Sequence, residues 1–217
     1  TTKLEDNCNC HTDNIVVFNG DGSDELFGGY IYIQDAPDVN SYQKEIIGLL
    51  KNIHYFDVLR SDRSISSNGL EPRTPFLDHD LTSYWLSINA KIRMSENKME
   101  KYLLRKAFEK QNDTDHEYLP KDILWRRKEA FSDGVSSKKD SWHTIIQNKL
   151  AERKITKGEF DLVETNFYYQ IFSSHYEHLN NPKDIIPHLW LPKWNGNKKD
   201  PSARTLDSYN VNNINSA

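Results

Sequence analysis

The pattern of hydrophobic positions predicts one short strand near the start of the chain, with helices after it. Residues 15–18 (Ile-Val-Val-Phe) form a β-branched and aromatic run that stops at Asn19-Gly20. Such a run is typical of a buried parallel strand. The sequence shows no second convincing strand, and a lone strand cannot satisfy its own backbone donors and acceptors. Its sheet partners are therefore expected from an upstream part of the protein or from another chain.

The remaining apolar positions recur mostly at helical spacing. A short helix is predicted over residues 26–33. A long helix begins at Ser41 and places Ile46, Leu50 and Ile53 on one face. The same face continues onto Asp57 and Arg60, and Asn68-Gly69 is a predicted stop. Further helices are predicted after a cap at Asp78 and around residues 103–108, 142–150 and 168–175.

Composition and charge argue against a nucleic-acid-binding protein, a membrane protein and a zinc protein. The 217 residues carry 28 Lys and Arg against 32 Asp and Glu, a net charge of -4, which excludes a strongly basic nucleic-acid-binding face. No apolar run approaches the roughly 20 residues that span a bilayer, so no membrane partner is expected. Cys8 and Cys10 offer too few ligands for a zinc site and indicate free thiols in a cytoplasmic protein. We expect a polar lead-in over residues 1–14, one domain over 15–195 and a polar tail over 196–217.

The strongest candidate for chemistry is the turn that follows the strand, residues 19–25 (Asn-Gly-Asp-Gly-Ser-Asp-Glu). Its glycines let the backbone approach a ligand, and the next helix presents free N–H groups, which suit a phosphate. Asp21, Asp24 and Glu25 would repel a bare phosphate, but a bound Mg²⁺ would reconcile the two charges. The alternative is that these acidic residues only stabilise the helix dipole.

Three other segments have a functional and a structural interpretation. Asp57 and Arg60 lie one turn apart on an otherwise apolar face and form either a site or a structural ion pair. Prolines 72 and 75 stiffen the stretch that carries Glu71 and Arg73, which is either part of a site or a rigid connector. The cations of residues 126–128 either face a phosphate or form a solvated basic patch.

Together and in this order, the segments resemble the synthetase half of the glutamine-dependent asparagine synthetases. The matching stretches are residues 17–30, 56–60, 69–79, 100–108, 119–136, 193–194 and 200–206. The resemblance implies an α/β fold of the adenine-nucleotide α-hydrolase-like (PP-loop ATP pyrophosphatase) type, of which this chain would hold mainly the helical C-terminal half. It also implies a ligase that uses ATP and Mg²⁺ to convert aspartate to asparagine through β-aspartyl-AMP. The ammonia would come from glutamine hydrolysed in a separate N-terminal glutaminase domain.

The resemblance implies roles for individual residues. Asn19, Gly20, Gly22 and Ser23 would line ATP, Asp21 would help to form the acyl-adenylate, and Asp24 would lie at the Mg²⁺–pyrophosphate end. Lys128 would fold back over the turn and stabilise charge on the transferred adenylyl group. The remaining pocket residues would be Glu25, Asp57, Arg60, Glu71 and Arg73.

The chain also departs from the family pattern. Asp21 stands where the family has Glu, and Asn19 stands where it has Ser. The upstream Ser-Gly-Gly-x-Asp-Ser pyrophosphate loop and the N-terminal catalytic cysteine are absent from these residues, so this chain alone is expected not to complete the reaction. A β-lactam-synthetase-like enzyme and a catalytically silent paralogue that acts as a binding module are the alternatives; residues 131–135 favour the asparagine enzyme over the former, and Asp21 points to the latter.

Overall fold

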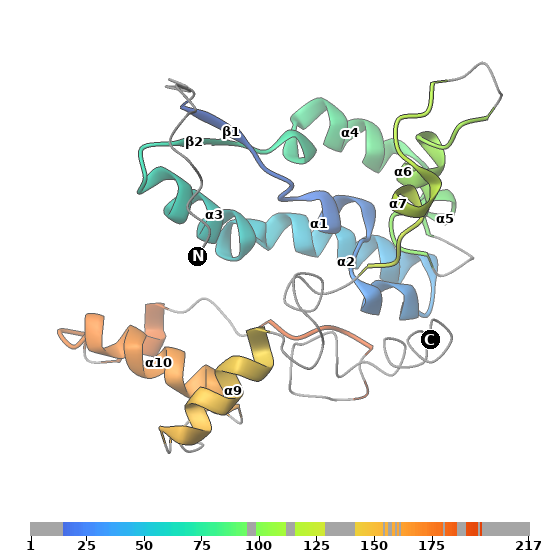
Figure 1. Cartoon of the computed structure of the whole chain (residues 1–217). Helices are drawn as coiled ribbons and strands as arrows, with labels where there is room; N and C mark the ends of the chain where they lie inside the picture. The colour runs from blue at the N-terminus through green and yellow to red at the C-terminus, as the bar shows by residue number, and fades with distance from the viewer. Residues whose placement is uncertain are drawn as a thin grey trace.

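The computed structural model describes residues 15–94, 99–111, 116–128, 142–153, 155, 158, 160, 162–179, 181–185, 190–194 and 196. Helices predominate, with one small parallel sheet (Figure 1). The two strands are β1 (Val16–Phe18) and β2 (Glu71–Arg73). The α-helices are α1 (Ser23–Phe27), α2 (Val39–Asn52), α3 (Asp57–Ser66), α4 (His79–Ser87), α5 (Ala90–Arg93), α6 (Tyr102–Ala107), α7 (Lys121–Leu124), α9 (Trp142–Glu152) and α10 (Val163–His175). The 3₁₀-helices are η1 (Ile31–Asp35), η2 (Ile53–Tyr55), η3 (Pro75–Leu77) and η4 (Pro182–Ile185).

The strand that pairs with β1 comes from this chain, and not from an upstream part of the protein or another chain as expected. The strand is parallel, as predicted, but β2 of the same chain pairs with it, with Val17 opposite Pro72. Sequence pattern missed β2 because Glu71-Pro72-Arg73 has no β-branched or alternating apolar signature. Proline is tolerated on an edge strand, and the backbone of Glu71 and Arg73 bonds to the residues that flank β1.

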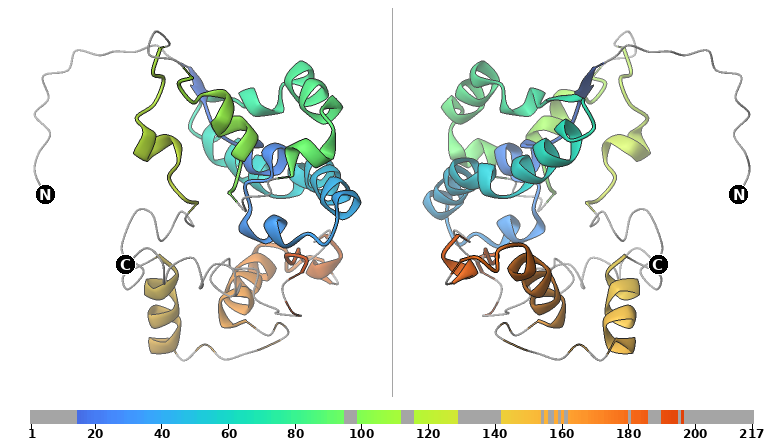
Figure 2. Two further views of the ribbon diagram at one scale, coloured as in Figure 1. Left: turned by 90° about the vertical axis from the view of Figure 1, so that its right-hand side faces the viewer. Right: turned by 90° about the vertical axis from the view of Figure 1, so that its left-hand side faces the viewer.

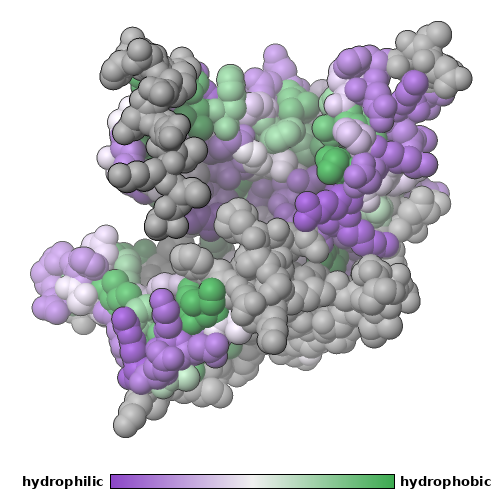
Figure 3. Space-filling model, in the orientation of Figure 1, coloured by the Kyte–Doolittle hydropathy of each residue, from purple (hydrophilic) through white to green (hydrophobic). Residues whose placement is uncertain are grey.

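The prediction that β1 is buried is wrong for this chain. Val16 and Val17 are 44% and 37% exposed, and Phe18 is 76% exposed. Within the described residues the sheet has only two strands, so little packs on its faces. Hydrophobic surface is accordingly visible beside β1 in Figure 3.

The predicted helix over residues 26–33 is in fact two short elements. The α1 helix begins earlier, at Ser23, and ends at Phe27 because Gly28 takes a left-handed conformation with φ +66°. The chain then turns into η1. This reversal brings Tyr30 back beside Glu25, which matters for the site described below.

The predicted long helix from Ser41 is interrupted. Its first part, α2, is capped by Asp38, whose carboxylate accepts a hydrogen bond of 2.8 Å from the Ser41 amide. After η2 the backbone breaks at Phe56, with φ -121° and ψ -109°, and α3 begins at Asp57. The predicted stop is confirmed, since Gly69 has φ +74°.

Two neighbouring clusters form the core. In one, η1 packs on α2 through Tyr32, Ile33 and Ile46. In the other, the Phe27 ring of α1 meets Trp85 of α4 edge-on, with centroids 4.5 Å apart. The α4 helix begins at the predicted cap, where Asp78 accepts hydrogen bonds from two backbone amides.

The helices α9 and α10 pack against each other below the main group (Figures 1 and 2). Both coincide with predicted helices. Among the residues that the structure describes, no helix combines the length and the apolar character that crossing a membrane requires.

Candidate functional site

In the turn after β1, Gly22 permits a conformation that other residues rarely adopt, and Gly20 leaves the backbone open to a ligand. Gly22 has φ +87°, and a Cβ there would lie 2.3 Å from the Leu77 side chain, so the turn depends on glycine. Gly20 has open space around it, with no atom within 4 Å of where a Cβ would stand. The backbone at Gly20 is thus free to approach a ligand.

Asp21 is held in place by neighbours on both sides. Its amide donates to the Asn19 side-chain oxygen at 3.0 Å, and the Asn19 side-chain amide donates to its carboxylate at 3.2 Å. The same carboxylate oxygen accepts a hydrogen bond from the Ser61 hydroxyl of α3. Asn19 therefore does more than present its backbone, because its side chain orients Asp21.

Two lysines converge on the single carboxylate of Asp24. The Lys101 ammonium lies 2.7 Å from Oδ1, and the Lys128 ammonium lies 2.6 Å from Oδ2. Lys101 also donates to the Ser23 hydroxyl at 2.9 Å. Asp24 and its two lysines together carry one positive charge in excess, and the Asp21 carboxylate lies three residues away in the same turn.

The backbone around Asp24 is shaped for this contact. Lys101 has φ +56°, a left-handed conformation that non-glycine residues seldom adopt. A Cβ on Gly29 would lie 2.0 Å from the Asp24 carboxylate and 2.4 Å from the Lys101 side chain. Burial alone would raise the pKa of Asp24, but the two ammonium groups outweigh it and hold that pKa below its ordinary value.

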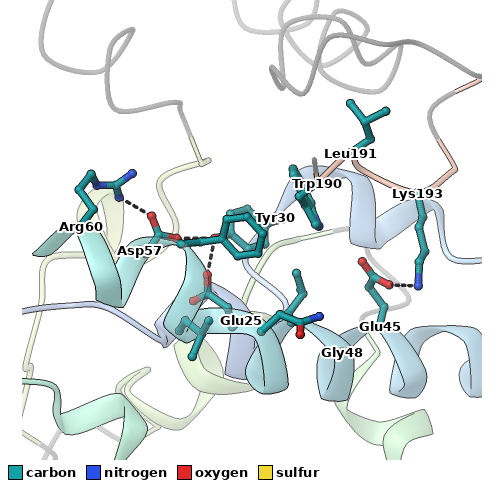
Figure 4. A pocket seen from close by; sticks show the side chains of 13 residues that line it. Glu25, Tyr30, Glu45, Gly48, Asp57, Arg60, Trp190, Leu191 and Lys193 are labelled. Atoms are coloured by element: carbon teal, nitrogen blue, oxygen red, sulfur yellow. Dashed lines mark hydrogen bonds and ion pairs between the residues drawn. The ribbon is translucent and has the colours of Figure 1, made fainter. Parts of the chain in front are cut away.

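A pocket of about 340 Å³ includes Glu25, the residue that follows Asp24 in α1, in its wall (Figure 4). Glu25, Tyr30, Asp57 and Arg60 form one polar end of this pocket, and the Glu45–Lys193 pair lies at the other. The Tyr30 hydroxyl donates to Glu25 and lies 3.3 Å from Asp57, and Arg60 pairs with Asp57. The pair that the sequence left open as structural or functional is thus both an ion pair and a part of the pocket wall.

The pocket holds a carboxyl group that resists ionisation. Burial raises the pKa of Glu25, and the negative charge of Asp57 adds to this, while the Tyr30 hydroxyl partly opposes it. Burial and the Glu25 carboxylate likewise raise the pKa of Tyr30, which keeps its proton throughout the physiological range. The polar end of the pocket therefore offers a mixture of hydrogen-bond donors and acceptors.

A family model described as asparagine synthase matches residues 35–195. The chain belongs to this family. It is 46% identical to the asparagine synthetase (glutamine-hydrolyzing) of Gallus gallus, over 91% of this chain and 36% of the relative. It is 44% and 43% identical to the proteins of the same name from Bos taurus and Homo sapiens, with 92% of this chain and 36% of each relative covered. The chain thus spans about a third of the length of the curated relatives that it matches, and the family predicted from the sequence is confirmed.

The structure brings most of the predicted family residues together, while their chemical roles stay predictions. Lys128 lies over the turn, as the sequence predicted, whereas Arg126 and Arg127 are exposed. Glu71 and Arg73 do not reach the pocket: they pair with each other on β2, with their side chains about half exposed. Cys8, Cys10 and residues 131–135 and 200–206 lie outside the described residues.

Several residues of the site were not singled out from the sequence. Lys101 lies in a stretch that resembles the family, residues 100–108, where the leucine spacing predicted only a helix. Its neighbour Glu100 is buried. Ser61 and Tyr30 contact the site from α3 and from the reversal after α1. Their spacing along the chain carries no signal for these contacts, because each arises from a turn or a break in a helix.

The described residues do not form a ready-made metal site. No group of three or more His, Cys, Asp or Glu side chains is clustered among them. Both Asp24 oxygens are in contact with ammonium groups, and the two positive charges oppose the binding of a cation at the same carboxylate. Magnesium at Asp24 therefore stays a prediction.

Proposed function

We propose that this chain forms part of the synthetase site of an enzyme that converts aspartate to asparagine at the expense of ATP. The observation that carries the proposal is that two adjacent residues of α1 face different partners: Asp24 meets the ammonium groups of Lys101 and Lys128, and Glu25 lines the pocket with Asp57 and Arg60. A polyanion suits the first region and an amino-acid zwitterion suits the second. The fold proposed for the whole domain is of the PP-loop ATP pyrophosphatase type.

In this proposal the triphosphate lies along residues 19–23, with Lys101 and Lys128 facing the phosphates. The side chains of Lys101 and Lys128 are 20% and 32% exposed, so their charges are less screened than on an open surface. Aspartate lies in the pocket, with its ammonium group towards the carboxylates of Glu25 and Asp57. Arg60 is the cation at the same end and suits a carboxylate of the substrate.

The proposed reaction has two steps. An oxygen of the aspartate side-chain carboxylate forms a bond to the α-phosphorus of ATP, and the bond from that phosphorus to the bridging oxygen breaks, releasing pyrophosphate. Ammonia then attacks the acyl carbon of β-aspartyl-AMP, AMP leaves, and the nitrogen loses a proton. The first step joins two anions, so the two lysines contribute by offsetting the charge that gathers there.

Magnesium is proposed as the counter-ion that ATP brings with it. When bound, it would neutralise phosphate charge. Among the described residues, Asp24 is the proposed ligand of this ion, although Lys101 and Lys128 contact its carboxylate. No step of the proposed reaction depends on the metal.

The test uses a chimera in which this chain replaces the matching third of the Gallus gallus relative. We expect aspartate-dependent release of pyrophosphate and formation of asparagine, with glutamine as the nitrogen donor from the proposed glutaminase domain. The 217 residues alone should show no such turnover. A folded chimera that binds neither ATP nor aspartate would overturn the proposal.

Two other outcomes have their own meaning. AMP formation with a different carboxylic acid, and not with aspartate, would indicate a β-lactam-synthetase-like specificity. ATP binding without turnover, restored by Asp21→Glu, would indicate a silent site; the Asn19 and Ser61 contacts that tie Asp21 down are the features that make this outcome worth testing.

A further inference from the structure

Residues 190–194 of the C-terminal region, here called the strap, are anchored on α2 by a buried carboxylate. Glu45 is 3% exposed and lies in the middle of α2. It accepts a hydrogen bond of 2.7 Å from the Tyr32 hydroxyl and pairs with the ammonium group of Lys193. Lys193 comes from the strap and reaches down to Glu45, as Figure 4 shows.

Aromatic contacts hold the strap on both sides of this ion pair. The Trp190 ring packs on Tyr32 and Tyr30, with centroids 5.6 Å and 6.4 Å away, and Trp194 packs on Tyr32 at 6.1 Å. Trp194 also has φ +56°, an unusual conformation for a bulky residue. These ring contacts and the Lys193–Glu45 ion pair together hold the strap against η1 and α2.

The seated strap supplies one wall of the pocket. Trp190, Leu191 and Lys193 line it from above, opposite α2, η2 and the polar end with Glu25 and Asp57. Without the strap this space would open towards the solvent. Trp190 also packs on Tyr30, the residue that donates to Glu25, so the strap contacts the hydrogen-bonded group directly.

We infer that Lys193 is a positioning residue whose ion pair with Glu45 seats the strap and thereby closes the pocket around its ligand. The strap thus forms a wall of the pocket and the Lys193–Glu45 pair is its anchor, and neither assignment depends on the proposed function. Only the choice of aspartate as the ligand rests on the proposed function. Since no strap residue lies at Asp24, Lys101 or Lys128, the strap should govern the retention of the amino acid and leave ATP unaffected.

The first measurement needs no ligand and uses the 217-residue chain. Chymotrypsin cleaves after Trp190 only when this ring leaves Tyr30 and Tyr32, so the cleavage rate reports unseating. We expect Lys193→Gln to accelerate this cleavage about tenfold and Lys193→Arg to restore most of the protection. Lys51→Gln removes the same charge from an exposed position of α2 and should change nothing. Tyr32→Phe, which removes the other Glu45 donor, is a second variant that should also accelerate cleavage.

The second measurement compares the dissociation constants of L-aspartate and ATP. In the chimera, Lys193→Gln should weaken aspartate binding about tenfold and leave ATP binding unchanged, a split that a general loss of stability would not produce. If Lys193→Gln and Tyr32→Phe both leave cleavage as in the wild type, the inference is wrong. If the wild type binds no aspartate but the cleavage results hold, the proposed function fails while the strap assignment stands.

Discussion

The Ser61 hydroxyl of α3 donates a hydrogen bond to the Asp21 carboxylate in the turn after β1. It joins two segments 40 residues apart and orients the carboxylate of Asp21, where the sequence resemblance implies a glutamate in the family. Asn19 completes the arrangement from the other side. Asn19 and Asp21, the two residues that the sequence resemblance implies to differ from the family, are therefore in direct contact with each other.

Removing the Ser61 hydroxyl should slow the proposed reaction. In the chimera, Ser61→Ala should lower kcat about tenfold, because a hydrogen bond to a charged group contributes roughly 1.5–3 kcal/mol and a misplaced group reacts poorly. KM for ATP should change little. The matched control is Ser64→Ala, whose hydroxyl bonds only to carbonyl groups of its own helix. Equal rates for the two variants would show that the contact does not orient Asp21.

Asp24 should make the stability of the protein depend on pH. The pKa of its carboxyl is lowered in the folded chain, so its ion pairs stabilise the fold above about pH 4, the ordinary range of an aspartate, and this contribution is lost as the pH falls through the lowered value. We expect Asp24→Asn to reduce the free energy of unfolding by roughly 2 kcal/mol at pH 7. Urea titrations at several pH values should show the difference shrinking below pH 4. Asp62→Asn, on the exposed side of α3, is the control and should show little difference at any pH.

The two glycines of the turn should respond differently to alanine. Gly22→Ala should destabilise the fold by roughly 2–4 kcal/mol, since it combines a left-handed φ with a clash against Leu77. Gly20→Ala meets no neighbour and should leave the melting temperature nearly unchanged. If ATP lies along this turn, Gly20→Ala should nevertheless weaken ATP binding, which an equilibrium titration would measure. Unaltered binding in a folded Gly20→Ala protein would move the nucleotide away from the turn.

Glu25 should be a destabilising group at neutral pH. Its pKa is raised by burial, so ionising it in the folded chain is costly, and the cost disappears at a pH low enough to protonate it in both the folded and the unfolded chain. Glu25→Gln keeps an acceptor for the Tyr30 hydroxyl and removes the charge. We expect it to raise the free energy of unfolding by on the order of 1 kcal/mol at pH 7 and to lose this advantage near pH 4. A loss of stability at pH 7 would contradict this account.

The sequence predicted the elements whose signal is local. The β-branched run of β1, the cap at Asp78 and the stop at Gly69 were found because each depends on a few adjacent residues. The break at Phe56 was missed because the helical spacing continues past it onto Asp57 and Arg60, and β2 was missed because Glu71-Pro72-Arg73 lacks the β-branched or alternating pattern of a strand.

The residues of the candidate site also fall into those that local sequence signals predicted and those that they did not. The acidic glycine turn was visible from its residues, and Lys128 was placed over it through the family resemblance. The second lysine at Asp24, the Ser61 contact and the strap come from segments far along the chain, brought close by helix breaks and reversals. A single sequence holds no spacing rule for such contacts.

The paired lysines at Asp24 have a consequence for the order in which the molecule folds. Lys101 bonds to Ser23 across 78 positions, and Lys128 reaches Asp24 across 104. Loops of that length are slow to close, so these bonds are expected to form after the helices and to open before them under mild denaturant. If the proposed phosphate site is formed by these lysines, phosphate binding would then be lost while most of the helical signal persists.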